Sequence, residues 1–192
     1  MQISTLRIIG GQYGGRKLLA PPGMDTRPMP DRIKQSLFDW LGQDLTGLRV
    51  ADVCAGSGTV GLEAASRGAT EVVLIEAGRH AVPALNANLR ALGHPPEVRL
   101  ALRPFQQVLP TLKGFDLIFA DPPFPWFRED IPALESLMAL AAGALAPGGA
   151  LVVRGERGYD LPPAPPVYLP PETRFYGRSW VRQLRVRQSG TV

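Results

Sequence analysis

From Leu48 onward, the chain alternates short apolar runs with stretches of helical periodicity, and this alternation limits the possible fold more than any other feature. Such an order of elements is typical of a parallel sheet with helices on both faces. Several of the runs are continuously apolar, as strands buried on both sides require. We therefore expect a three-layer, doubly wound, Rossmann-like α/β sheet that is mostly parallel. Its strands would lie at 48–53, 71–76, 97–102, 115–120 and 150–153. One helix would follow the first strand and end near Ser66, and further helical segments would cover 80–92, 105–112 and 131–145.

The segments outside this alternation predict a few further elements. Residues 6–11 and 16–19 flank a glycine-rich turn and predict an N-terminal β-hairpin, and residues 31–41 have helical spacing. A proline-rich stretch at 162–171 is expected to be irregular, and 180–188 predict a last strand, antiparallel at or near the sheet edge. A hairpin is too small to be stable alone. We expect a single domain over 1–192, with 1–30 as a hairpin extension and 31–192 as the core.

The formal net charge of +4 is distributed unevenly. Residues 1–34 hold six basic and two acidic side chains, and residues 154–192 hold seven arginines and three acids. Residues 35–153 hold eight basic and twelve acidic side chains. Basic ends around an acidic middle suit a polyanion held by terminal elements, although solvated surface charge explains the pattern equally well.

Other features narrow the class of protein. No apolar run reaches the roughly 18 residues that span a bilayer, and residues 1–7 lack the features of a secretory signal. Cys54 is the only cysteine, and His80 and His94 lack the spacing of metal ligands, so neither a disulfide nor a metal site is expected. We expect a monomeric, cytoplasmic protein without a metal.

The loop Asp52–Gly61, with the sequence DVCAGSGTVG, leaves the first strand of the parallel sheet and enters a helix. Glycines here let the backbone turn tightly and approach a ligand, and ligands of such sheets bind at the carboxyl ends of the strands. Glu76 ends the next strand, 18 residues after Gly58, where a carboxylate can bind ribose hydroxyls. The sequence therefore predicts a site for a nucleotide cofactor.

Two cofactors fit the glycine loop, because it contains Gly-x-Gly-x-x-Gly: a nicotinamide dinucleotide and S-adenosylmethionine. Asp52 favours the second. A carboxylate four residues before the first glycine can hold a methionyl ammonium but is a poor neighbour for a pyrophosphate. Residues for hydride chemistry and a further catalytic domain are not evident. A nicotinamide oxidoreductase and a tight turn without a ligand remain as alternatives.

The tetrapeptide Asp121-Pro122-Pro123-Phe124 follows the strand at 115–120, at the same sheet edge as the glycine loop. The exocyclic amine of a nucleobase is a poor nucleophile because its lone pair is delocalised into the ring. Acceptors on both of its N–H groups localise that lone pair and stabilise the growing positive charge. The Asp121 carboxylate and the Pro122 carbonyl can supply these acceptors, and Phe124 can stack on the base. These three residues are the catalytic candidates, although Asp-Pro-Pro also forms ordinary turns.

These two loops resemble motifs I and IV of the class I amino-methyltransferases, and a wider set of residues resembles the RsmD family of small-subunit rRNA methyltransferases. The stretches that carry the closer resemblance are 7–11 with 15–18, Arg27-Pro28 with Asp31-Arg32 and 36–38, 55–58 with 61–64 and 66–68, and 121–124. Many amino-methyltransferases share the tetrapeptide. The N-terminal stretches are therefore the more specific part.

The resemblance implies methyl transfer from S-adenosylmethionine to N2 of a guanine in 16S rRNA, within an assembling small ribosomal subunit. It implies that the extension 1–30 faces the RNA, with contacts from Arg7, Arg16, Lys17, Arg27 and Arg32. The cofactor site would comprise Asp52, Ala55, Gly56, Ser57, Gly58, Glu76, Ala77, Gln106 and Asp121. Gln106 departs from the family, which often has an aspartate there that accepts from the adenine amine. Similarity weakens after the strand at 150–153.

Two further alternatives remain: an amino-methyltransferase for adenine N6 or cytosine N4, and a non-catalytic ribosome assembly factor with a vestigial pocket. The chain shows no target-recognition domain, which argues against a sequence-reading DNA enzyme, and two intact loops argue against decay.

Some residues have structural explanations. Cys54 is expected to pack beside the glycine loop, and Trp126 and Phe127 either wall the base pocket or pack in the core. Tyr13 either stacks on RNA or has no contact with it.

Overall fold

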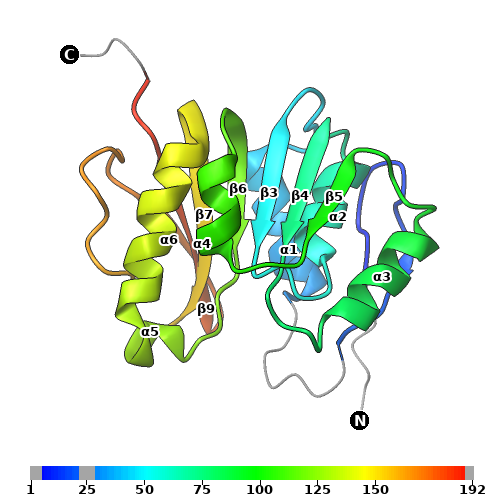
Figure 1. The fold of residues 1–192 in the computed structure, drawn as a ribbon, viewed down its shortest axis with the longest axis horizontal. Coiled ribbons are helices and arrows are strands. Elements are labelled where there is room, and N and C mark those ends of the chain that lie inside the picture. Colours follow the sequence, from blue (N-terminus) through cyan, green and yellow to red (C-terminus); the bar gives the residue numbers. More distant parts are fainter. Residues whose placement is uncertain (1–5, 22–28, 189–192) are drawn as a thin grey trace.

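The computed structural model describes residues 6–21 and 29–188, and within them a seven-stranded sheet forms the centre of the molecule (Figure 1). The strand order is β5-β4-β3-β6-β7-β9-β8. Neighbours from β5 to β7 run parallel, and β9 and β8 extend the sheet in antiparallel pairing. The bounds are β3 Arg49–Val53, β4 Glu71–Ile75, β5 Val98–Ala101, β6 Phe115–Ala120, β7 Leu145–Glu156, β8 Glu172–Tyr176 and β9 Ser179–Arg185. The expected doubly wound sheet with an antiparallel last strand is confirmed.

Helices cover both faces of the sheet, so that each central strand contributes to two cores. In β6, Leu117 and Phe119 belong to one buried cluster, whereas Ile118 and Ala120 belong to the other. Alternation of side chains along a strand sends neighbouring residues to opposite faces. On the first face lie α1 (Asp31–Leu41), α2 (Thr59–Ser66) and α3 (Val82–Ala91); on the second lie α4 (Phe105–Val108), η1 (Leu109–Thr111), α5 (Trp126–Glu129) and α6 (Ile131–Ala144).

Several elements differ from the sequence expectation in length or in kind. The hairpin strands β1 (Leu6–Arg7) and β2 (Lys17–Leu18) are only two residues long. β7 begins at Leu145 and passes through Pro-Gly-Gly at a register shift opposite β6, where the expected strand began only at Ala150. Such an irregularity accommodates residues that would otherwise end a strand.

Two short elements, β8 and α5, were not expected. β8 forms the sheet edge, where none of its residues is buried, so its sequence carries no apolar alternation. α5 is a single turn after the proline pair and shows no helical period. No helix in the described part of the chain is long and apolar enough to cross a membrane.

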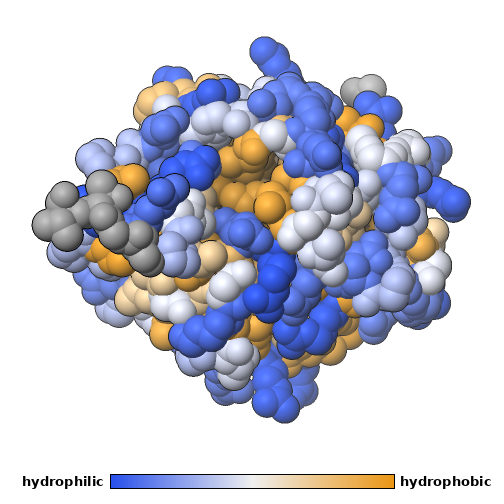
Figure 2. Space-filling model, turned by 90° about the horizontal axis from the view of Figure 1, so that it is seen from above, coloured by the Kyte–Doolittle hydropathy of each residue, from blue (hydrophilic) through white to orange (hydrophobic). Residues whose placement is uncertain are grey.

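The two edges of the parallel strands differ in character. β9 ends at the edge where the parallel strands begin, because its last residue, Arg185, pairs with Ala150 of β7 (Figure 1). Figure 2 looks onto this amino edge and shows hydrophilic side chains around an apolar hollow. The loops 54–58 and 121–124 leave β3 and β6 at the other edge.

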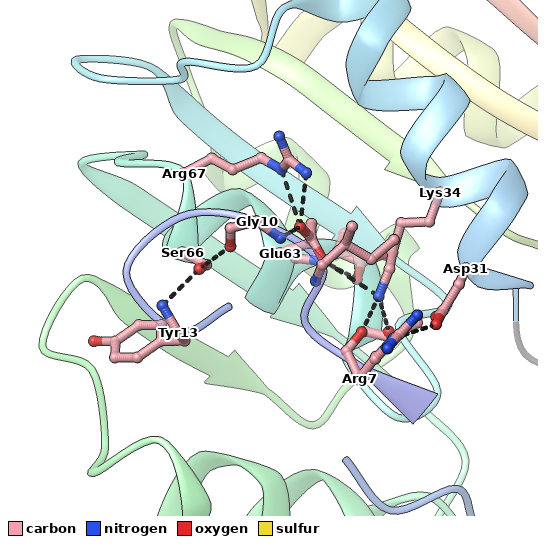
Figure 3. Close-up of polar contacts among 12 residues, drawn as sticks. Arg7, Gly10, Tyr13, Asp31, Lys34, Glu63, Ser66 and Arg67 are labelled. Atoms are coloured by element: carbon pink, nitrogen blue, oxygen red, sulfur yellow. Dashed lines mark hydrogen bonds and ion pairs between the residues drawn. The ribbon is translucent and has the colours of Figure 1, made fainter. Parts of the chain in front are cut away.

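A buried carboxylate fixes the N-terminal segment to α2 (Figure 3). The backbone N–H groups of Ile9 and Gly10 donate to the two oxygens of Glu63, each at 2.8 Å. Lys34 Nζ lies 3.2 Å from Glu63 Oε2, and Arg67 Nη2 lies 2.9 Å from Glu63 Oε1. The side chains of Lys34 and Glu63 are fully buried. We call Lys34, Glu63 and Arg67 the Glu63 cluster.

The Glu63 cluster changes how the basic N-terminal residues are understood. Lys34 was counted among the charges available to a polyanion, yet it is buried and donates to the Arg7 carbonyl at 2.5 Å and to Thr59 Oγ1 at 3.0 Å. Burial lowers the pKa of Lys34, and the nearby Glu63 opposes this shift. Lys34 is therefore an internal link between α1, β1 and α2.

Substitution of Glu63 tests how far the fold depends on this cluster. Glu63→Gln leaves two buried cations without their anion, which typically costs about 3–5 kcal/mol. We expect the free energy of unfolding, measured in urea, to fall by that amount. The control Glu71→Gln removes a half-exposed carboxylate that pairs with Arg49, where about 0–1 kcal/mol is expected. Equal losses in the two variants would contradict a structural role for the cluster.

Candidate active site

The two predicted functional loops lie side by side at the carboxyl edge of the sheet. β3 and β6 are adjacent and parallel, with Val53 opposite Ala120. The Asp121 N–H continues this pairing and donates to the Val53 carbonyl at 3.2 Å. The order of the strands reverses at β3: β4 and β5 follow it on one side, and β6 and β7 lie on the other. This is the place where ligands bind in doubly wound sheets.

A cavity of about 350 Å³ opens between the two loops. Most of the residues predicted to bind the cofactor or the base line it: Asp52, Ala55, Gly56, Ser57, Glu76, Ala77, Gln106, Asp121, Pro122 and Phe124. Gly58 is not part of the lining. A side chain at this position would point into the core, since an added Cβ would lie 2.9 Å from Leu85 Cδ2.

The Glu76 carboxylate, directly after the neighbouring strand β4, accepts a backbone hydrogen bond from the glycine loop. Gly56 and Gly58 have φ values of 56° and 75°, and Cys54 has 58°, so three residues adopt the left-handed region. Glu76 Oε2 accepts from the Gly56 N–H at 2.7 Å, and Oε1 accepts from the Gly78 N–H at 2.6 Å. A carboxylate oxygen has more than one lone pair. Glu76 can therefore bind hydroxyl groups of a ligand while it supports the loop.

Asp52 is buried at the floor of the cavity. Its side chain accepts from the Gly61 N–H in the first turn of α2 at 2.8 Å. Burial raises the pKa of Asp52 to about 7, with the Gly61 hydrogen bond acting in the opposite direction and the Asp121 and Glu76 charges adding to the rise. A cation bound beside Asp52 would favour its ionised form. The site therefore suits a positively charged ligand group.

The loop 121–124 presents a carboxylate and an aromatic ring to the same cavity. Burial raises the pKa of Asp121, and the adjacent Arg154 guanidinium opposes this shift. Arg154 Nε donates to Asp121 Oδ1 at 2.8 Å. Pro122 is buried, whereas Phe124 and Trp126 are half-buried and line the cavity. Phe127 packs in the core, edge-on to Trp180 with the ring centroids 5.6 Å apart.

Sequence reasoning missed several residues of the cavity wall. Arg154 is the most informative of them, and an arginine directly after the apolar run of β7 was the signal that could have revealed it. His80, expected to be structural or on the surface, is exposed and lines the cavity. Burial raises the pKa of the Cys54 thiol, which is consistent with the packing role expected for it. No group of metal-binding type is found among the described residues.

The residues predicted to contact RNA lie apart from the cavity lining. Arg7, Arg16, Lys17 and Arg32 are exposed, and Arg7 pairs with Asp31 at 2.7 Å. Arg27 lies outside the described residues. Met29, which directly precedes α1, does line the cavity. Pro21, the last residue of the first described range, lines the cavity as well. The N-terminal segment, residues 6–21, and the cavity are therefore neighbours.

Comparisons with known proteins agree with this geometry. The family model described as "Conserved hypothetical protein 95" matches residues 6–184. Ribosomal RNA small subunit methyltransferase D of Escherichia coli K12 is 37% identical over 164 residues, which are 83% of this chain and 79% of that protein.

Two solved structures are similar to this chain over more of its length than the sequence relative is. The Escherichia coli protein yhhF, described provisionally as a methyltransferase, has a TM-score of 0.80 at 33% identity and covers 95% of this chain and 98% of its own. A hypothetical protein of Thermus thermophilus has a TM-score of 0.77 at 33% identity, with 94% and 99% covered.

The fold and the paired loops define the class of the protein as a Rossmann-like methyltransferase, a class that uses a methyl-donor cofactor. Within this class the chain belongs to the RsmD family, to which the "Conserved hypothetical protein 95" model corresponds. The family expectation from the sequence is thereby confirmed.

Close packing under the glycine loop makes a testable prediction. An added Cβ at Gly61 would lie 2.3 Å from Leu74 Cδ2 and 3.1 Å from the Asp52 side chain. Overpacking of this kind costs about 1–3 kcal/mol, so Gly61→Ala should lower the thermal unfolding midpoint. Gly143→Ala is the control, because that position in α6 is exposed and an alanine there gains about 0.5–1 kcal/mol. A Gly61→Ala protein as stable as wild type would contradict this packing.

Proposed function

We propose that this protein transfers a methyl group from S-adenosylmethionine to the exocyclic N2 amine of a guanine in small-subunit rRNA. The observation that carries the proposal is the adjacency of the Asp121–Phe124 loop and the glycine loop over one cavity. The family supports the class of reaction, and the name of the Escherichia coli relative supports rRNA as the substrate. The acceptor pair Asp121 and Pro122 supports an amine as the methylated group.

The residues of the cavity fit S-adenosylmethionine in their chemistry. Asp52 would hold the methionyl ammonium, Glu76 the ribose hydroxyls, and the backbone of 55–58 would allow close approach. Ala77 and Phe105 offer apolar surface for the adenine, and Gln106 offers an amide oxygen in place of the usual aspartate. When bound, the cofactor supplies an electrophilic methyl group on a sulfonium.

The tetrapeptide would prepare the base for attack. The Asp121 carboxylate accepts a hydrogen bond from one N–H of the amine, and the Pro122 carbonyl accepts a hydrogen bond from the other. These two bonds concentrate the lone pair on nitrogen. Proline fixes the direction of that carbonyl because its φ is locked. Phe124 stacks on the base. A base must leave its stack to reach this cavity, and the fixed contacts then hold it in line for transfer.

The exposed basic residues of the N-terminal segment would bind the RNA around the target nucleotide. Arg7, Arg16, Lys17 and Arg32 can contact phosphates, and Arg27 is assigned to the same set from the sequence. We propose that residues 1–30 form the RNA-facing extension of a single-domain, monomeric, metal-free enzyme. It would act in the cytoplasm on assembling small ribosomal subunits.

The pH dependence of cofactor binding tests the role of Asp52. Because the pKa of Asp52 is raised to about 7, its carboxyl group binds a proton below that pH, and the ammonium must displace this proton. We expect calorimetry to show affinity for S-adenosylmethionine falling by up to about tenfold per pH unit between pH 7 and 5.

Two variants separate Asp52 from other groups at the site. Asp52→Asn keeps an acceptor for Gly61 but should bind more weakly and without this pH dependence. His80→Gln is the control, because His80 also lines the cavity and histidine is a common source of pH dependence. If His80→Gln abolished the dependence and Asp52→Asn kept it, the assignment of Asp52 would be wrong.

Removal of the catalytic carboxylate tests the proposed reaction. Asp121→Ala should reduce methyl transfer to small subunits by roughly 100-fold or more, with affinity for S-adenosylmethionine changed by less than about threefold. Tritiated methyl transfer to small subunits, free rRNA and DNA measures both the rate and the substrate class. Asp160→Ala, which removes an exposed carboxylate paired with Arg182, should retain activity. Full activity of Asp121→Ala, or transfer to DNA alone, would refute the proposal.

A further inference from the structure

One guanidinium group joins the catalytic loop to the neighbouring strand. Arg154 lies in β7 with its side chain 5% exposed. Its Nε donates to Asp121 Oδ1 at 2.8 Å, and its guanidinium carbon lies 5.5 Å from the centre of the Phe124 ring. Arg154 therefore contacts two of the three predicted catalytic residues.

The sheet fixes the position from which Arg154 reaches the loop. Val153 pairs with Ala120 of β6, and Arg154 itself pairs with Val181 of β9. Strands on both sides thus hold the backbone of β7 at this point. A buried arginine requires a nearby anion, and Asp121 provides one. The orientation of the Asp121 carboxylate is thereby tied to three adjacent strands.

We propose that Arg154 is a positioning residue for methyl transfer, which holds the Asp121 carboxylate with Oδ2 turned toward the base amine. This inference rests on the proposed function and adds a residue to it. Oδ1 accepts from Arg154, so Oδ2 is the oxygen assigned to the substrate. The planar guanidinium also fixes the orientation of its partner better than a lysine ammonium would.

The charges around Asp121 explain why a cation is needed there. Asp52 from β3 and Glu76 from the end of β4 face the same cavity, and His80 and Arg103 also line it. Burial raises the pKa of Asp121, whereas Arg154 lowers it. A protonated Asp121 would carry no charge, and one of its oxygens would become a hydrogen-bond donor. It could then no longer accept from both Arg154 and the base amine as the ionised carboxylate does. Loss of Arg154 should therefore move the acidic limb of the rate profile to higher pH.

Single-turnover methylation of small subunits across pH 5.5–9 tests this role. Arg154→Met should lower the rate roughly 10- to 100-fold and shift the acidic limb upward, with affinity for S-adenosylmethionine within about threefold of wild type. Arg154→Lys keeps the charge without the planar geometry. It should keep the acidic limb near that of wild type while the rate stays about tenfold low.

A matched control comes from the neighbouring strand. Arg182 of β9 lies opposite Val153 and pairs with Asp160 at 2.5 Å, and it does not line the cavity. Arg182→Met should leave both the rate and the pH profile unchanged. Circular dichroism establishes that each variant is folded, and Arg154→Lys decides the matter if Arg154→Met fails to fold. Wild-type rates and profiles in a folded Arg154 variant would overturn the inference.

A direct titration separates this inference from the proposed function. Carbon-13 NMR of the Asp121 carboxyl group should show a higher pKa in Arg154→Met than in wild type, and no such rise in Arg182→Met. This readout needs no substrate. If wild-type protein methylated no rRNA, the proposed function would fail while the titration still tested the ion pair. An unchanged Asp121 pKa in an otherwise active enzyme would overturn only the role of Arg154.

Discussion

The parallel pairing of β3 with β6 is the constraint on which the candidate active site depends. Two loops that are more than sixty residues apart in sequence become neighbours because their strands pair and end at the same edge. The hydrogen bond from the Asp121 N–H to the Val53 carbonyl continues that pairing into the loops. The carboxylates that line the cavity therefore come from adjacent strands, and the ladder of backbone hydrogen bonds sets their separation before any ligand arrives.

The Glu63 cluster plays the corresponding role for the N-terminal segment. One buried carboxylate accepts two backbone N–H groups of that segment and pairs with Lys34 and Arg67. Buried ion pairs contribute little net stability but are costly to break, so the cluster specifies where the segment docks. Lys34 also donates to Thr59 at the start of α2, a residue of the cavity lining. The same network thus connects the segment that we assign to RNA with the cavity between the two loops.

The layered fold and the paired loops could be predicted from the sequence because they follow from local patterns: apolar runs, glycines and prolines. β8 could not, since an exposed edge strand needs no apolar alternation. The extension of β7 through Pro-Gly-Gly was hidden because those residues ordinarily end a strand and only the pairing with β6 accommodates them. Lys34 was taken for a surface charge and Arg154 was overlooked, and the same reason applies to both. The burial of a charged side chain depends on partners distant in sequence, Glu63 and Asp121 respectively.

A crystal structure with bound S-adenosylhomocysteine would show whether the cavity between the two loops holds the methyl donor beside the site for the base. We expect the ribose hydroxyls on Glu76, the ammonium beside Asp52, and the sulfur turned toward the side chains of Asp121 and Phe124. A product bound elsewhere, or seated in the cavity with its sulfur facing away from Asp121, would contradict the account of how the two loops meet a methyl group and a base amine.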